Sequence, residues 1–267
     1  MMLEGKVGIV TGAANGIGRA TAIRMAAEGA KLGLMDIHGE GLEKTKELIL
    51  SHTPEAEIIC LNADISLEGQ VRDAVEKLVC RFDKLNIAFN NAGISAGVGR
   101  PIHELDSADW EKAMTVNAFG TFFCAKYELV HMVKNGEPGS IVFTSSTGGI
   151  MGFPLGCGYN CSKHAIIGLM KNIMCDYAQY GIRSNAICPS QSDTPMNDAN
   201  MDMLGLDEAG KAKFKRTRSP MRRISTPDEI AAAVVFLLSD DSSHVSGITM
   251  MIDGGQSATN ENYFNWD

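Results

Sequence analysis

The sequence predicts a single doubly wound α/β domain, with a parallel seven-stranded sheet and helices on both of its faces. Three observations predict this fold. Short apolar runs alternate with helical patterns along the chain, the runs are continuously apolar, and no linker or low-complexity tract interrupts them. Continuously apolar runs are typical of parallel strands that are covered on both faces. A chain of 267 residues, 45% of them hydrophobic, can bury a large core in one such domain.

The elements follow one another from the N-terminus in a regular order. Strands are expected at 6–12, 31–36, 57–64, 85–91, 140–145, 183–188 and 249–252. Helices are expected between them, at 17–28, 40–51, 67–82, 107–133, 159–180 and 227–238. The fifth helix is the clearest, because Ile166, Met170 and Ile173 recur at about 3.6-residue spacing. The alternation implies right-handed crossovers between parallel strands.

Two segments interrupt the alternation. Residues 190–223 are rich in Met, Asp, Lys and Arg, and no strand fits their pattern. Residues 256–267 are polar with three aromatic side chains, and they could be disordered or could dock on a neighbouring subunit. We therefore expect one domain over 1–255 and a C-terminal tail over 256–267.

The composition excludes several classes of function. Lys and Arg number 24 and Asp and Glu number 32, so the formal net charge is −8. An acidic balance without a basic run argues against nucleic acid or an anionic membrane as partner. No apolar run approaches the roughly 18 residues needed to cross a bilayer, and a secretory segment is missing from the start of the sequence, so we expect a cytoplasmic protein. The seven cysteines and six histidines show no metal-ligand spacing, so no metal site is expected.

A glycine-rich turn follows the first strand and opens a helix, with the sequence Thr11-Gly12-Ala13-Ala14-Asn15-Gly16-Ile17-Gly18. Glycines permit a tight turn and close approach to a pyrophosphate, and a helix N-terminus attracts anions. The pattern alone could be an ordinary turn. Its position directly between a strand and a helix indicates a dinucleotide site.

Acidic side chains end the second and third strands. Asp36 follows Gly18 by eighteen residues and can accept hydrogen bonds from both ribose hydroxyls of NAD, whereas it would repel a 2′-phosphate. Positions 13–15 and 37 carry no Arg or Lys that could bind that phosphate, so we expect NAD and not NADP. For Asp64 two interpretations stay open, an adenine contact and a polar strand terminus.

Tyr159 and Lys163 lie four residues apart in the fifth predicted helix, and Ser146 lies thirteen residues upstream of the tyrosine. Positions i and i+4 share a helix face, and a nearby ammonium lowers the pKa of a phenol from its usual value near ~10. A serine hydroxyl from another element could bind a substrate oxygen. By itself the spacing is also compatible with a half-buried tyrosine beside a solvated lysine. Together with the glycine-rich turn, it predicts proton transfer to or from an alcohol.

The ordered motifs resemble those of the short-chain dehydrogenase/reductase family, over roughly residues 5–255. After the glycine-rich turn, the motifs that carry the resemblance are Asn90-Asn91-Ala92-Gly93, Asn117, Ser146, Tyr159 with Lys163, Pro189 with Thr194, and Asp253-Gly254-Gly255. The chain departs from the family at Ser190, where glycine is usual. A side chain is therefore expected beside the nicotinamide at this position.

The resemblance implies a Rossmann-type fold and an NAD-dependent oxidoreductase that interconverts a secondary alcohol and a ketone. It implies that Tyr159 is the general acid/base, that Ser146 orients the substrate oxygen, that Lys163 binds the nicotinamide ribose and lowers the phenol pKa, and that Asn117 holds a relay water. Thr194 would contact the nicotinamide carboxamide. The full set of implied cofactor-binding residues is Gly12, Asn15, Gly16, Ile17, Gly18, Asp36, Asp64, Ile65, Asn90, Ala92, Gly93, Tyr159, Lys163, Pro189 and Thr194. A homo-oligomer, tetramer or dimer, is implied as well.

Residues 190–223 fall where this family places a mobile lid over the substrate. The lid carries the apolar residues Met196, Met201, Met203 and Leu204. Two interpretations stay open: these side chains bind an apolar ligand of irregular shape, or they pack the lid against the domain. Our hypothesis is a hydrophobic alcohol or ketone, such as a steroid or terpenoid. Two other functions stay open: reduction of a β-ketoacyl thioester, and nucleotide sensing without catalysis.

Overall fold

A computed structural model describes residues 1–259 of the chain, and in it seven parallel strands form one sheet in the order β3-β2-β1-β4-β5-β6-β7. The strands are β1 (Val7–Thr11), β2 (Lys31–Asp36), β3 (Ile58–Asn62), β4 (Ile87–Asn90), β5 (Gly139–Thr144), β6 (Ile182–Pro189) and β7 (Thr249–Ile252). The predicted doubly wound fold is confirmed. Most of the predicted tail, residues 260–267, lies outside the described residues.

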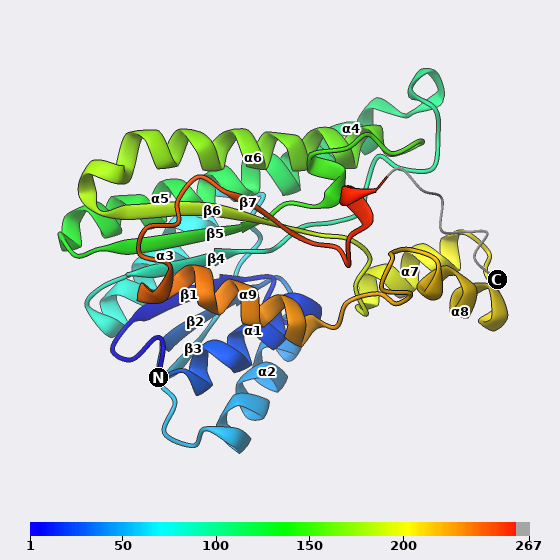
Figure 1. The fold of residues 1–267 in the computed structure, drawn as a ribbon. Helices are drawn as coiled ribbons and strands as arrows, with labels where there is room; N and C mark the ends of the chain where they lie inside the picture. The colour runs from blue at the N-terminus through cyan, green and yellow to red at the C-terminus, as the bar shows by residue number, and fades with distance from the viewer. Residues whose placement is uncertain (260–267) are drawn as a thin grey trace.

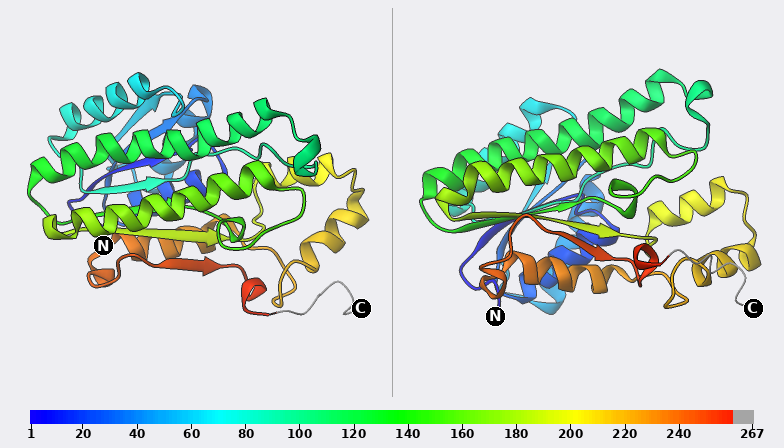
Figure 2. Two further views of the ribbon diagram at one scale, coloured as in Figure 1. Left: turned by 90° about the horizontal axis from the view of Figure 1, so that it is seen from above. Right: turned by 45° about the horizontal axis from the view of Figure 1, so that its top comes forward.

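Two helical layers cover the sheet, as Figures 1 and 2 show. One layer holds α1 (Gly16–Ala27), α2 (Gly39–His52) and α9 (Pro227–Leu238). The other holds α3 (Glu68–Phe82), α4 (Ser107–Ala113), α5 (Thr121–Asn135) and α6 (Cys157–Tyr177). Short 3₁₀ turns, η1 (Ile102–Glu104), η3 (Thr147–Gly149), η4 (Ala178–Tyr180), η5 (Asp240–Ser242) and η6 (Gln256–Ala258), complete the connections.

The two layers explain why the strands are apolar without alternation. Successive side chains of a strand point to opposite faces of the sheet. In β1, Ile9 joins the core beneath α3, α5 and α6, and Val10 joins the core beneath α1, α2 and α9. Both side chains are completely buried. A strand with water on one face would have carried a polar residue at one of these positions.

The predicted helix at 107–133 is not continuous in the structure. A π-helical segment, η2 (Met114–Gly120), separates α4 from α5. Such wider turns insert an extra residue into a helix and occur frequently at functional sites. Gly120 lets this segment approach the chain after β3 closely, since a Cβ on Gly120 would lie 2.8 Å from the Ile65 side chain. The segment places Asn117 in the protein interior.

The segment 190–223 contains two short helices, α7 (Pro195–Met203) and α8 (Glu208–Arg216), which the sequence patterns do not predict. Figure 1 shows them extending beyond the carboxyl ends of the strands. Backbone hydrogen bonds close the base of this segment, from Asp193 N to Ser225 O (2.9 Å) and from Ser225 N to Gln191 O (3.2 Å). We call residues 190–223 the lid.

Candidate active site

The predicted site residues meet at the carboxyl edge of the sheet, around the neighbouring strands β1 and β4. The chain order reverses there, because β1 continues to β2 and β3 on one side and β4 leads to β5 and β6 on the other. Loops diverge from such a point and leave a crevice, where open α/β sheets bind their ligands. Gly12 follows β1, Asn90 ends β4, Ser146 follows β5 and Pro189 ends β6.

The glycine-rich turn has the geometry of an anion-binding helix start. Gly12 and Gly16 adopt positive φ angles of 68° and 52°, where side-chain-bearing residues are strained. A Cβ on Gly18 would lie 2.0 Å from Gly12 O, so only glycine fits. Asn15 begins α1 but does not cap it with its side chain, and the first N–H groups of the helix therefore stay available to a ligand. This arrangement fits the pyrophosphate of a dinucleotide.

Asp36 lies beside that turn, at the end of β2. Its Oδ2 accepts a hydrogen bond from Ala14 N (3.1 Å) and its Oδ1 accepts one from His38 N (3.0 Å). Each carboxylate oxygen can accept a further bond, so the group fits a pair of ribose hydroxyls. Asp64 is different, because its Oδ1 accepts from both the N–H and the hydroxyl of Ser66. These bonds are compatible with the interpretation of Asp64 as a polar strand terminus. They also leave its Oδ2 available for a ligand, so the adenine contact stays open.

Tyr159 and Lys163 occupy one face of the first two turns of α6. Lys163 Nζ lies over the Tyr159 ring, 5.7 Å from its centroid, and donates a hydrogen bond to Thr144 O (2.9 Å). The Ser146 hydroxyl acts on the Tyr159 phenol and lowers its pKa, and Ser146 Oγ accepts a hydrogen bond from Gly148 N (3.1 Å). The structure therefore brings the three residues together. Lys163 is buried, and the other two are partly buried.

The electrostatics of this cluster differ from the sequence-based expectation. Burial raises the pKa of Tyr159, and the hydrogen bond from Ser146 opposes this rise only in part. Burial also lowers the pKa of Lys163 to about 8. The net shift of the phenol pKa is upward, and the ammonium of Lys163 is directed at Thr144 O and lies over the ring face. The expected lowering by Lys163 stays a prediction for the complex with the cofactor. The structure holds Tyr159 as a neutral phenol with a hydroxyl proton to give.

Asn117 is fully committed to protein partners. Its Oδ1 accepts from Ile94 N (2.8 Å), and its Nδ2 donates to Ile94 O (3.0 Å) and Ser162 Oγ (3.0 Å). These bonds tie the π-helical segment to α6 and to the chain after β4. Gly93 fits tightly between them, since a Cβ there would lie 3.0 Å from Asn117 Oδ1 and 3.5 Å from Lys163 Nζ.

Asn90 does not face the crevice with its side chain, in contrast to the expectation. It is buried, and its Nδ2 donates to Glu128 Oε2 on α5 (2.7 Å). The strand alternation explains this, because it turns Asn90 toward the α5 layer. Ala92 reaches the site with its backbone, and Ala92 N donates to Thr11 Oγ1 (3.0 Å).

The lid meets the glycine-rich turn through Thr194. This residue caps α7, and its Oγ1 accepts a hydrogen bond from Asn197 N (3.3 Å). Its Cγ2 lies 3.4 Å from the position of a Cβ on Gly16. Pro189 ends β6 within the sheet ladder, directly before the lid. Of the two predicted cofactor residues that are apolar and bulky, Ile65 is buried and Ile17 is partly buried.

Sequence reasoning missed the polar groups that hold this cluster in place. Ser145 Oγ donates to Lys163 O (2.9 Å), and Thr144 supplies the carbonyl that binds Lys163 Nζ. Thr11 Oγ1 accepts from the N–H groups of both Asn91 (2.9 Å) and Ala92. The available signal was position, since each residue lies at a strand end beside a recognised motif.

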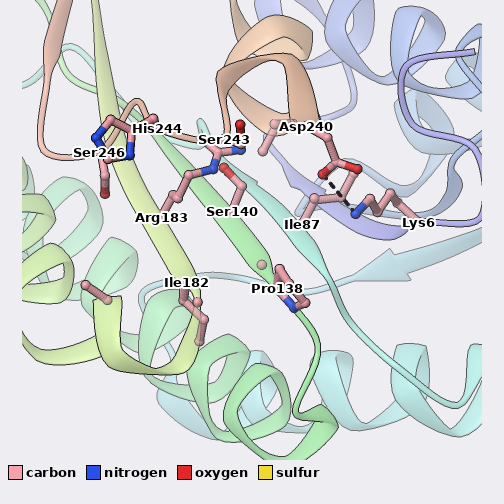
Figure 3. A pocket seen from close by; sticks show the side chains of 14 residues that line it. Lys6, Ile87, Pro138, Ser140, Ile182, Arg183, Asp240, Ser243, His244 and Ser246 are labelled. Carbon is pink, nitrogen blue, oxygen red and sulfur yellow. Dashed lines mark hydrogen bonds and ion pairs between the residues drawn. The ribbon is translucent and has the colours of Figure 1, made fainter.

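A pocket of about 570 Å³ lies at the opposite edge of the sheet (Figure 3). Its lining includes Ile87 and Ile182, the first residues of β4 and β6. Lys6 in its wall pairs with Asp240 (3.2 Å). The guanidinium of Arg183 donates to the backbone carbonyls of Leu237, Ser239 and Val245. These contacts satisfy the end of α9, so we assign Arg183 a structural role.

Among residues 1–259, no helix is both long and apolar enough to cross a membrane. In the same part of the chain, no group of three or more His, Cys, Asp or Glu side chains could hold a metal ion.

A family model described as enoyl-(acyl carrier protein) reductase matches residues 12–257. The chain is 42% identical to a levodione reductase of Leifsonia aquatica, over 95% of this chain and 94% of that protein. It is 38% identical to a 2,5-dichloro-2,5-cyclohexadiene-1,4-diol dehydrogenase of Sphingobium indicum, over 96% and 98%. It is 34% identical to 3beta-hydroxysteroid dehydrogenase 2 of Eggerthella lenta, over 96% of each.

Solved structures agree with these relatives. The crystal structure of levodione reductase superposes with a TM-score of 0.92 at 40% identity, covering 96% of this chain and 99% of that one. Carveol dehydrogenase from Mycobacterium avium in complex with NAD gives 0.91 at 29% identity, over 97% and 99%. NAD⁺-bound xylitol dehydrogenase gives 0.89 at 34% identity, over 96% and 100%.

Proposed function

Because the chain belongs to the short-chain dehydrogenase/reductase family, we propose that it uses NAD(H) to interconvert a cyclic, largely apolar secondary alcohol and the corresponding ketone. The observation that carries this function is the Ser146–Tyr159–Lys163 cluster beside an uncapped helix start. The cluster places a proton donor and acceptor, an orienting hydroxyl and a cation next to a dinucleotide cleft. The relatives named above are reductases and dehydrogenases as well.

Each residue of the cluster has a distinct part in this proposal. In the oxidative direction, Tyr159 takes the hydroxyl proton of the alcohol, and Ser146 holds the same oxygen. Bound NAD⁺ supplies the hydride acceptor. Lys163 uses one N–H on Thr144 O, and its other two donors are available for the nicotinamide ribose hydroxyls. Asn117 keeps Lys163 and the π-helical segment in register through Ser162 and Ile94.

The raised pKa of Tyr159 gives the chemistry a direction. A neutral phenol is ready to protonate a ketone oxygen, so reduction finds the residue in its working state near neutral pH. Oxidation requires the phenolate, which the positive charges of Lys163 and of the oxidised nicotinamide ring would stabilise. We therefore propose that oxidation needs a more alkaline solution than reduction does.

The remaining cofactor contacts follow from the glycine-rich turn. The α1 start would bind the pyrophosphate, with Gly12, Asn15, Gly16, Ile17 and Gly18 around it. Asp36 would bind the adenine ribose hydroxyls and exclude NADP. Asp64 and Ile65 would lie at the adenine end, and Ala92 and Gly93 would line the cleft. Pro189 and Thr194 would close the nicotinamide end.

The substrate class rests on the lid and on the relatives. Met196, Met203 and Leu204 are exposed apolar side chains of the lid, whereas Met201 is buried and packs the lid. Exposed methionines adapt to apolar ligands of irregular shape. Relatives named for a cyclohexadienediol and a hydroxysteroid support a ring substrate. Xylitol dehydrogenase, 34% identical, is named for an open polyol, so the choice of a ring depends on the apolar lid.

A direct assay tests the proposal. Purified protein with NAD⁺ would be offered cyclic apolar alcohols and, as the polar comparison, xylitol, with NADH absorbance as the readout. We expect kcat/KM at least about tenfold higher for the best cyclic alcohol, because a polyol would bury unpaired hydroxyls beneath an apolar lid. A higher kcat/KM for xylitol would contradict the proposal that the substrate is a cyclic apolar alcohol. Binding of NADH without turnover of any alcohol or ketone would instead favour a nucleotide sensor.

One observation favours a second function, reduction of an acyl thioester. The matching family model is described as enoyl-(acyl carrier protein) reductase. Asp36 and the net charge of −8 oppose it, since NADPH and an acidic carrier both need basic side chains. Oxidation of NADH or NADPH with an enoyl or β-ketoacyl thioester, faster than NADH oxidation with any cyclic ketone, would establish this function.

We also propose a homo-oligomer that works in the cytoplasm. Trp110, Phe119 and Phe122 are exposed along α4, η2 and α5, and a second copy of the chain would cover them. Exposed thiols such as Cys161 and Cys175 stay reduced in that compartment. Light scattering of the purified protein would give a dimer or tetramer mass, and a monomer would contradict the proposal.

A further inference from the structure

Glu128 on α5 is a completely buried carboxyl group to which the proposed reaction gives no part. Its Oε2 accepts a short hydrogen bond of 2.7 Å from Nδ2 of Asn90, the last residue of β4. A buried carboxylate is costly without a cation close by. Within residues 1–259, the influences on Glu128 are burial and the Asn90 hydrogen bond, and no cation is among them.

Two oxygens of this pair have no partner among the described residues, Glu128 Oε1 and Asn90 Oδ1. If Glu128 were ionised, both would be acceptors without a donor in the interior. A proton on Oε1 would turn that oxygen into a donor, and Asn90 Oδ1 is the unpartnered acceptor of the same pair. The carboxyl O–H can then donate to Asn90 Oδ1 while Asn90 Nδ2–H donates to Oε2. The pair becomes a reciprocal acid–amide pair with two hydrogen bonds.

The surroundings favour this protonated form. Burial raises the pKa of Glu128 to about 8, and the hydrogen bond from Asn90 lowers it only in part. Cys124, one turn earlier on α5, is the titratable side chain that the Glu128 charge affects, and burial chiefly keeps its thiol protonated by raising its pKa. The packed elements β4 and η2 carry no ionisable side chain. Helix α3 also packs against α5, but its carboxylates interact with other residues. Glu68 hydrogen-bonds Lys126 and Tyr127, and Glu76 acts on His131.

The pair anchors a segment that lines the cofactor cleft. Directly after Asn90, the N–H groups of Asn91 and Ala92 donate to Thr11 Oγ1, at the start of the glycine-rich turn. Gly93 follows and lies close to Lys163, since a Cβ on Gly93 would be 3.5 Å from Lys163 Nζ. Displacement of Asn90 would therefore be transmitted to the pyrophosphate turn and to the ribose-binding lysine at once.

We propose that Glu128 is a positioning residue that acts as a neutral acid, locked with Asn90 in a reciprocal pair, and that loss of its proton loosens residues 90–93 and weakens NAD(H) binding. This inference rests on the proposed NAD(H) site and is independent of the alcohol substrate. An ionised Glu128 would direct two acceptor oxygens at Asn90 and break one of the two bonds.

Glu128→Gln is the decisive variant, because glutamine reproduces the donor and acceptor of the protonated acid and cannot ionise. The dissociation constant of NADH would be measured by fluorescence from about pH 6 to about pH 10 for both proteins. We expect equal constants, within about twofold, near pH 7, and a wild-type constant about tenfold higher than that of the variant near pH 10. Lys163, with a pKa of about 8, also titrates in this range, and the ratio of the two constants cancels its effect.

Glu47→Gln serves as the matched control, since Glu47 is an exposed glutamate of α2. Its ratio to wild type should stay near one at every pH. A ratio for Glu128→Gln that also stays near one would overturn the proposal. If that variant does not fold, infrared spectra of the wild-type protein replace it: a buried carboxylic C=O band near pH 6 that is lost near pH 10 supports the neutral acid, and its absence near pH 6 overturns it.

The readout separates this inference from the proposed function. NADH binding needs no substrate, so a protein that binds NADH but oxidises no alcohol would still give an interpretable ratio. Failure to bind NADH at any pH would contradict the cofactor assignment and the Glu128 proposal together.

Discussion

Lys163 and Glu128 lie in the same helical layer, and burial shifts their pKa values in opposite directions to meet at about 8. Lys163 borders the cofactor cleft and has a backbone carbonyl as partner, Thr144 O. Glu128 lies beneath the end of β4 and has an amide as partner, Asn90. Within residues 1–259, neither side chain forms an ion pair with a carboxylate or a cation that would hold it ionised, and burial is the main influence on both pKa values.

The difference between the two regions lies in what can reach them. The lysine keeps two N–H donors for a ligand, and a ligand with hydroxyl oxygens can restore its preference for the charged form. Glu128 is completely buried, and within residues 1–259 one hydrogen bond from Asn90 opposes the cost of ionising it only in part. A cleft residue can thus be tuned by what binds, whereas a core residue of equal pKa is tuned by the fold alone.

The largest effect expected is on the cleft side of this comparison. Tyr159→Phe should lower kcat/KM for the best alcohol about a thousandfold, because the group that takes the proton is gone. NADH affinity should change far less, by about threefold at most, because Tyr159 is one of many implied cofactor contacts whereas the proton transfer depends on it. Steady-state kinetics and NADH fluorescence check the two halves. Tyr180→Phe, an exposed tyrosine of η4, is the control.

The next effect is on pH dependence, where the two regions act in opposite directions. Tyr159 has a raised pKa, so the rate of oxidation should climb about tenfold per pH unit on the acid side. Ionisation of Glu128 should limit that climb above about pH 8, where its pKa lies. A pH profile of kcat/KM that rises for wild type and continues further upward in Glu128→Gln checks both. If the two pH profiles of kcat/KM were identical above pH 8, the predicted effect of Glu128 ionisation would be contradicted.

The difference in stability between wild type and Glu128→Gln should follow the ionisation of Glu128. The folded-state pKa of Glu128 is raised to about 8, so its contribution is full below the unfolded pKa near 4.5 and is lost as pH rises toward 8. We expect the free energy of unfolding of wild type, relative to Glu128→Gln, to fall by a few kcal/mol over that window, since one pKa unit is worth about 1.4 kcal/mol. Urea titrations near pH 5 and pH 8 measure it. If the difference in unfolding free energy between the two proteins were the same at both pH values, Glu128 would not be the group that loses a proton in this range.

A smaller effect is expected on the choice between NAD and NADP, which we assign to Asp36. Asp36→Ala should narrow the preference for NAD over NADP about tenfold, because the repulsion of a 2′-phosphate is removed. The backbone bonds from Ala14 and His38 would also be lost, so NAD affinity should fall modestly. Ratios of kcat/KM for the two cofactors give the answer. Glu40→Ala, an exposed carboxylate of α2, should leave the ratio unchanged.

The smallest effect expected is on the lid. Met196 follows the cap of α7 by two residues, and Met203 ends the same helix. Met196→Ser should raise KM for a cyclic apolar substrate about threefold with kcat unchanged, because it removes apolar contact made equally in ground and transition states. Met203→Ser, farther from Thr194, is the matched comparison and should have little effect. Equal effects of the two would mean that the lid merely packs.

The strands, their parallel direction and the proximity of Tyr159 and Lys163 could be predicted, because they depend on local spacing. Apolar runs report burial on both faces, and a four-residue interval on a helix fixes which side chains meet. The π-helical segment around Asn117 could not be predicted, because a single inserted residue leaves the helical pattern of 107–133 almost unchanged. The lid helices escaped too, since their polar sequences carry little periodicity.

The sequence by itself predicted the fold class, which the structure confirms, and it pointed to the proposed nucleotide turn and the proposed proton-transfer residues. Those features are encoded in spacings within one strand or one helix. Tertiary structure alone decided the direction of the Tyr159 pKa, the turning of Asn90 away from the crevice and its pairing with Glu128. Each of these depends on burial and on partners distant in the chain, since Asn90 and Glu128 are 38 residues apart. Desolvation is a property of packing, and no local pattern records it.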